Sequence, residues 1–234
     1  MDVLGPLWTR VSAQVPLPLE VLLAAAVAAL VVVASPALWR PARTVVTIAH
    51  EGAHGLAALA TGRRLAGIRL HSDTSGLTVS AGRPTGPGMV LTLLAGYVGP
   101  GLFGLAAAAL LAAGHAVGVL WAVLGLLALL LLQIRNLYGL WAVLVTGAVV
   151  LGVTEWLPPA GQAAFAAAVT WFLLLAAPKT VVELQSKRRR RSGAPDSDAD
   201  QLARLTRLPG LLWVGVFLLV DLGALALGTA WLVA

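Results

Sequence analysis

The 234-residue sequence contains no cysteine and few charged residues, which make up only 11% of the chain. Without cysteine the chain can form no disulfide, no thiolate metal site and no cysteine nucleophile. A bound metal would therefore need histidine, carboxylate or amide ligands. A soluble domain has about 25% charged residues, so the scarcity of charge argues against a soluble protein.

Apolar residues make up 59% of the chain, its mean hydropathy is +0.90, and long apolar runs recur along its whole length. Each run is long enough to cross a hydrocarbon core about 30 Å thick. Only Gly114 and His115 separate the third run from the fourth, so the sequence predicts an all-α polytopic membrane protein with a bundle of six or seven transmembrane helices. The expected helices lie at residues 18–37, 44–62, 88–113, 116–134, 137–154, 161–178 and 211–233.

Three parts of the chain are expected. Residues 1–178 form a membrane domain, residues 179–209 a cytoplasmic linker, and residues 210–234 a C-terminal transmembrane helix. The linker carries a basic run followed by acidic residues, and its ADQLARLTRLP stretch predicts a short amphipathic helix. The polar composition of the linker distinguishes it from the apolar segments on both sides.

The basic residues are unequally distributed between the expected loops. If the N-terminus lies inside, all of the 16 basic residues except Arg40 and Arg43 lie on the inner side. Because inner loops carry an excess of Lys and Arg, this count predicts a cytoplasmic N-terminus. The run Lys187–Arg191 is then expected to contact anionic lipid, and the net charge of +6 needs no nucleic-acid partner.

The helix expected at 44–62 contains the sequence HEGAH, residues 50–54. On a helix His50 and His54 share one face, with Cβ atoms about 5–6 Å apart, so both rings can reach one zinc ion at about 2.0–2.1 Å. Glu51 lies one position round the helix, where it can act as general base on a zinc-bound water. In soluble helices such a string also arises by chance. In a membrane helix a central charge costs about 2.5–3.5 kcal/mol, which favours a metal site.

Two stretches follow this helix. GIRLHSDTSGLTVSAG, residues 67–82, alternates in polarity around a Ser75–Gly76 turn and predicts a β-hairpin. The next apolar run contains Gly96, Gly99 and Gly101 with Pro100. These residues predict a third helix that is either kinked or packed closely against the HEGAH helix.

HEGAH in an apolar helix, the GIRLHSDTSGLT hairpin and the LLAGYVGPGLFG helix together resemble the site-two-protease group of intramembrane zinc metallopeptidases, and above all its compact bacterial branch. The resemblance covers residues 40–135 and extends loosely to 215. It implies an integral protein of the bacterial cell membrane that uses zinc to hydrolyse peptide bonds of transmembrane protein substrates. It also implies that His50 and His54 bind zinc and that Glu51 is the catalytic base.

The same resemblance assigns the hairpin a role in substrate binding. It implies that the hairpin presents an edge to an extended substrate, with His71, Ser75 and Gly76 as the candidate contacts.

The third zinc ligand does not follow from the resemblance alone. The larger family takes it from an Asn…Pro…Leu-Asp-Gly segment, whereas residues 135–147 here keep Asn136 but have Thr146 and Gly147 in place of Asp-Gly. Asp198 ranks first, because a Ser-Asp-Ala segment followed by LARLT resembles a feature of the compact branch. Asp198 could instead be a solvated residue of the linker or the N-cap of a helix. In that case Asp221 or Asn136 is the candidate for the third ligand.

Two functions remain open from the sequence. The first is an intramembrane zinc metalloprotease. The second is a catalytically inactive membrane scaffold, or a metal-binding protein, that retains the protease fold. The missing Leu-Asp-Gly segment is what keeps the second alternative open.

Overall fold

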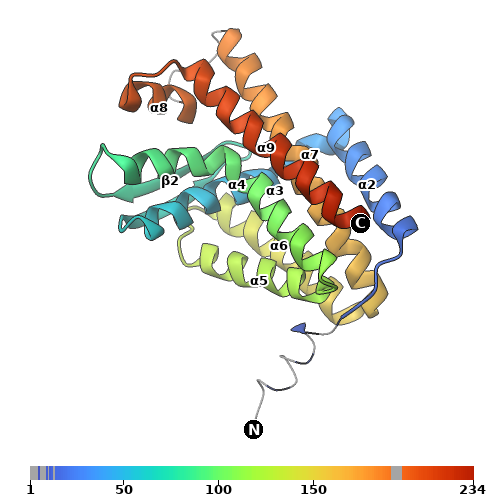
Figure 1. Ribbon diagram of the computed structural model, residues 1–234. Coiled ribbons are helices and arrows are strands. Elements are labelled where there is room, and N and C mark those ends of the chain that lie inside the picture. The colour runs from blue at the N-terminus through green and yellow to red at the C-terminus, as the bar shows by residue number, and fades with distance from the viewer. Residues whose placement is uncertain (1–4, 6–8, 10, 13, 191–196) are drawn as a thin grey trace.

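The computed structural model describes residues 5, 9, 11, 12, 14–190 and 197–234. The described chain is a helical bundle with one small antiparallel sheet (Figure 1), so the predicted all-α membrane architecture with a hairpin after the HEGAH helix is confirmed. Its elements are α2 (Leu19–Ala34), α3 (Pro36–Ala60), β1 (Arg64–Leu70), β2 (Gly76–Ala81), α4 (Pro87–Ala112), α5 (Ala116–Leu131), α6 (Leu137–Trp156), α7 (Pro159–Arg189), α8 (Asp198–Thr206) and α9 (Gly210–Val233).

The predicted count of six or seven spans is not confirmed. Four of the described helices, α4, α6, α7 and α9, are long and apolar enough to cross a membrane. Helices α2 and α3 pass that test only as a pair, which is bent by 101° at its junction, and α5 has only 16 residues. The sequence pattern counted each apolar run as a separate crossing. Proline disfavours helical backbone in the residue before it, so the Ser35–Pro36 step marks the break between α2 and α3, but the count did not use this signal.

Helices α4 and α7 form the centre of the bundle, with α3 and α9 against α4 and α2 against α7. Small residues make this close packing possible, because alanine and glycine let helix backbones approach. Ala166, Ala167 and Ala177 on α7 are fully buried. A Cβ added to Gly99 on α4 would lie 2.2 Å from the Cβ of Ala53 on α3. The predicted close packing between these two helices is confirmed.

The hairpin is fixed to the bundle through β1. The backbone N–H of Ile68 donates to the carbonyl of Gln133 (2.7 Å), and the N–H of Arg135 donates to the carbonyl of Ile68 (2.9 Å). The side chain of Asn136 extends this pairing by bonding both backbone groups of Leu70. One edge of β1 is therefore closed by residues 133–136 and the other by β2. Within the described sheet, β2 pairs with β1 alone.

The structure places Arg43 beside residues that the charge count assigned to the opposite side of the membrane. Its guanidinium lies 3.3 Å from the carboxylate of Glu183, and Glu183 also accepts a hydrogen bond from the indole of Trp39 (2.7 Å). Lys179, which the charge count placed on the inner side, lies over the Trp39 ring. The sharp bend between α2 and α3 brings the start of α3 beside the last turns of α7. The charge count therefore no longer supports a cytoplasmic N-terminus.

Candidate metal centre

Helix α3 carries the HEGAH residues and aligns them along the face that packs on α4. The helix begins at Pro36, whose fixed φ angle suits a first helical position. Glu51 and His54 are buried, and the His50 ring is partly exposed. The Nε2 atoms of the two histidines lie 3.1 Å apart. The four-residue spacing thus brings two metal-binding nitrogens together, as expected for one face of a helix.

Helix α8 brings a carboxylate to these two nitrogens. Ser197 is the N-cap of α8 and accepts a hydrogen bond from the backbone of Asp200, so Asp198 is the first helical residue rather than the cap. One oxygen of Asp198, Oδ2, lies 3.3 Å from Nε2 of His50 and 3.2 Å from Nε2 of His54. Two elements that are far apart in the sequence therefore supply the three atoms.

The spacing of these atoms suits a zinc ion. Tetrahedral zinc with bonds of about 2.0–2.1 Å keeps its ligand atoms about 3.3 Å apart, close to the three distances in this site. The Nδ1 atom of His54 lies 2.7 Å from the carbonyl oxygen of Thr92. This contact favours the tautomer with the proton on Nδ1, which leaves the lone pair of Nε2 free for a metal. The donor set of two imidazoles and one carboxylate therefore fits zinc.

The charge of Asp198 is well supported. Burial of the carboxyl group opposes its ionisation, but the positive charge of His54 and hydrogen bonds from both histidines outweigh the effect of burial. Together they hold the pKa of Asp198 well below its ordinary range. A zinc ion bound by the two histidines would replace their Nε2 protons and would itself supply the positive charge that keeps Asp198 ionised.

Glu51 is held beside the three atoms by the hairpin. The hydroxyl of Thr78 on β2 donates to Oε2 of Glu51 (2.6 Å), which fixes the orientation of this carboxylate. Gly76 packs directly against the same side chain, because an added Cβ would lie 2.4 Å from Oε1. The absence of a side chain at Gly76 thus lets the strand approach the glutamate.

The site opens into a polar cleft of about 700 Å³ between α3, β2, α4, α7 and α8. Ser75 and Gly76, two of the predicted substrate contacts, line this cleft. His71, the third, is exposed at the hairpin turn, where its Nδ1 lies 3.3 Å from the hydroxyl of Ser75, outside the lining of the cleft. The cleft is large enough for a segment of polypeptide to reach Glu51.

A family model described as Peptidase M50B-like matches residues 23–228 of the chain. The chain belongs to this family. Because this is the family of the site-two proteases, the resemblance seen in the sequence is confirmed. A search of curated proteins and a search of solved structures returned no match. The family is one of intramembrane metallopeptidases, which typically depend on zinc.

The other ligand candidates of this M50B-like chain lie in different surroundings. The amide of Asn136 is occupied by both backbone groups of Leu70. Asp221 is fully buried on α9 against Gly101 of α4, where an added Cβ would lie 2.4 Å from its Oδ1. Among the described residues, the group of histidines and carboxylates able to hold one metal ion consists of His50, His54 and Asp198.

Three residues of the M50B-like centre were not singled out from the sequence. Thr92 orients His54 through a backbone carbonyl, which any residue type would supply, so no sequence signal exists for it. Thr78 is one of several polar residues in the hairpin, and only the register of the strands shows that it reaches Glu51. Tyr97 lies edge-on to His50 with ring centroids 4.7 Å apart, and its place in the AGYVGP segment was its only signal.

Proposed function

We propose that the chain is a zinc metalloprotease that hydrolyses peptide bonds of membrane-protein substrates, with His50, His54 and Asp198 as zinc ligands and Glu51 as the catalytic base. The observation that carries this proposal is the convergence of two imidazole nitrogens and one carboxylate oxygen within 4.8 Å of one another. Glu51 lines the same cleft, and the family is one of metallopeptidases.

Each residue has a distinct part in the reaction. A zinc ion held by these ligands would polarise the carbonyl of the scissile peptide bond and lower the pKa of a water molecule. Glu51 accepts the proton of the attacking water and delivers it to the leaving amine. Thr78 keeps the carboxylate of Glu51 in one orientation through its hydrogen bond to Oε2. Helix α4 and the hairpin cover the site, which limits the access of lipid and excess water.

The hairpin supports binding of an extended substrate. Strand β2 pairs with β1 on one side only, and its residues Gly76, Leu77 and Thr78 line the cleft. An unpaired strand edge binds a peptide through main-chain hydrogen bonds. A substrate helix must therefore unwind locally before its backbone can lie along β2 beside Glu51.

We also propose the bacterial cell membrane as the location, which the resemblance to the compact branch supports, and anionic lipid as a partner of the basic run at the end of α7. Arg189 and Arg190 are exposed there and are the described residues best suited to contact lipid headgroups. Arg188 is paired with Asp200, and Lys187 lines the cleft. Arg191 lies outside the described residues.

The test compares Glu51→Gln with the wild type in detergent. The variant should bind one zinc per chain and cleave a dye-labelled unfolded polypeptide at least 1000-fold more slowly, because an amide cannot accept the proton. Glu20→Gln, at the exposed start of α2, is the control and should cleave at the wild-type rate. Cleavage by Glu51→Gln at the wild-type rate would refute the mechanism. Zinc binding without cleavage in the wild type would favour a metal-binding protein that retains the fold.

A further inference from the structure

Helix α8 is short and depends on tertiary contacts for its position. It has nine residues, fewer than the 12–15 at which isolated helices become even marginally stable in water. Its buried residues are Ala199 and Leu202, which pack into an apolar cluster with Val214 and Phe217 of α9 and residues of α4 and α7. The position of Asp198 therefore depends on a short helix that tertiary contacts must stabilise.

An ion pair joins α8 to the end of α7. The guanidinium of Arg188 donates twice to Oδ1 of Asp200, from Nε at 3.1 Å and from Nη2 at 2.7 Å. Its Nη1 donates to the side chain of Gln185 (3.0 Å). The other oxygen of Asp200 accepts from the hydroxyl of Ser197, the N-cap of α8. Arg188 thus bonds Asp200 directly and is connected through Asp200 to Ser197, the residue before Asp198.

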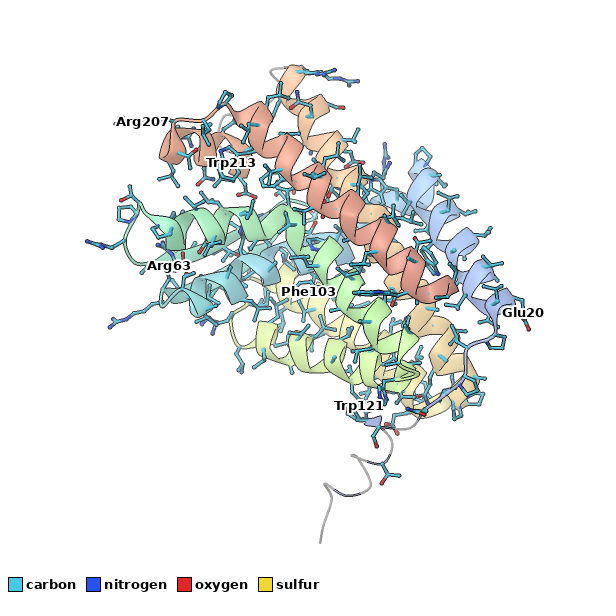
Figure 2. All side chains as sticks on the ribbon, viewed as in Figure 1. Glu20, Arg63, Phe103, Trp121, Arg207 and Trp213 are labelled. Atoms are coloured by element: carbon cyan, nitrogen blue, oxygen red, sulfur yellow. The ribbon has the colours of Figure 1, made fainter. Side chains whose placement is uncertain are left out.

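The contact is also closely packed. The side chains of Arg188 and Asp200 are only 18% and 25% exposed, which strengthens a charge-assisted pair over an open surface one. Gly210, the first residue of α9, packs on the guanidinium, because an added Cβ would lie 2.4 Å from Nη2 of Arg188. The ends of α7, α8 and α9 therefore meet at this arginine. Figure 2 labels Arg207 and Trp213 at the same end of the bundle.

We propose that Arg188 is a positioning residue that docks α8 on the bundle, so that docking of α8 and binding of zinc stabilise each other. The proposal rests on the proposed zinc site. Because Asp198 reaches the two histidines only when α8 is docked, the apparent zinc affinity equals the intrinsic affinity multiplied by the docked fraction. By reciprocity, zinc bound across α3 and α8 must increase that fraction.

The basic run offers a matched control for Arg188. Arg189 is the next residue and belongs to the same run, but it is exposed and lies outside the pair with Asp200. A lipid-binding or topological role of the run would make the two arginines equivalent. A positioning role makes Arg188 different from Arg189.

The first measurement is a zinc titration of the purified full-length chain in detergent. Arg188→Gln should bind zinc about tenfold more weakly than the wild type, and Arg189→Gln should stay within twofold. Arg188→Lys keeps the charge but loses the paired donors, so its affinity should lie between them. Gly210→Ala displaces the guanidinium without changing any charge and should weaken zinc binding several-fold. Equal affinities for the wild type, Arg188→Gln and Gly210→Ala would overturn the proposal.

The second measurement follows hydrogen exchange of the α8 backbone amides with and without zinc. Zinc should slow exchange in α8 of the wild type at least fivefold. It should have no such effect in His54→Ala, which lacks one ligand. If the wild type binds zinc but exchange in α8 does not change, the coupling is refuted while the zinc site stands. If the folded wild type binds no zinc, both this inference and the proposed function fail.

Discussion

Helices α3 and α8 supply the same metal centre in different ways. Helix α3 has 25 residues, packs closely on α4, and holds His54 buried with Nδ1 against the Thr92 carbonyl. Helix α8 has only nine residues, and its contacts with the bundle include an apolar patch and the ion pair between Arg188 and Asp200. The folded bundle thus positions the two histidines before a metal binds. Asp198, the third donor, reaches them only in the fraction of molecules in which α8 is docked. The free energy of metal binding is therefore partly spent on local folding of α8.

Removal of one ligand from each helix should give the largest effects. His54→Ala should abolish measurable zinc binding, because it destroys the pair of nitrogens that the bundle holds ready. Asp198→Ala should weaken zinc binding at least 100-fold but leave weak binding to the two histidines. Zinc titrations of both variants make the comparison. Wild-type affinity in Asp198→Ala would show that the third ligand lies elsewhere and would redirect the search to Asp221 or Asn136.

Gly96→Ala tests whether α3 is held rigidly against α4, and it should have the second largest effect on zinc affinity. An added Cβ on α4 would lie 2.3 Å from Nε2 of His54 and 2.8 Å from Cε1 of His50, so the methyl group must displace both rings. Since α3 and α4 are closely packed here, neither helix can move away cheaply. We expect zinc affinity to fall about 100-fold in a titration. Gly147→Ala on α6, where an added Cβ meets no atom within 4 Å, is the control. Unchanged affinity in Gly96→Ala would mean that α3 is more adaptable than its packing indicates.

The same contrast explains how much of the molecule the sequence predicts. His50, Glu51 and His54 lie within one helical turn, so the 3.6-residue period alone places them together. The hairpin and the close packing of the glycine-rich helix also follow from local patterns. Asp198 is 144 residues away from His54, and its position depends on how α8 packs on α4 and α9. No local period encodes that packing, so only the resemblance pointed to this residue.

The differences between the expected and the observed topology have a related cause. The sequence treats each apolar run as one crossing, but the chain bends by 101° between α2 and α3, where Ser35 is extended directly before Pro36. The ion pair between Arg43 and Glu183 joins segments that are 140 residues apart in the chain. A count of charges by loop does not include such contacts, which is why the two residues were assigned to opposite sides.

The smallest expected effect concerns a peripheral contact of α8. The indole N–H of Trp213, in the first turn of α9, donates to the hydroxyl of Thr206 in the last turn of α8 (3.1 Å). Trp213→Phe removes this hydrogen bond, which contributes about 0.5–1.5 kcal/mol, and keeps most of the aromatic packing. Zinc affinity should fall two- to fivefold in a titration. Trp141→Phe, at an exposed position on α6, should change nothing. If Trp213→Phe weakened zinc binding as much as Arg188→Gln, the docking of α8 would depend on its whole surface and not chiefly on the ion pair.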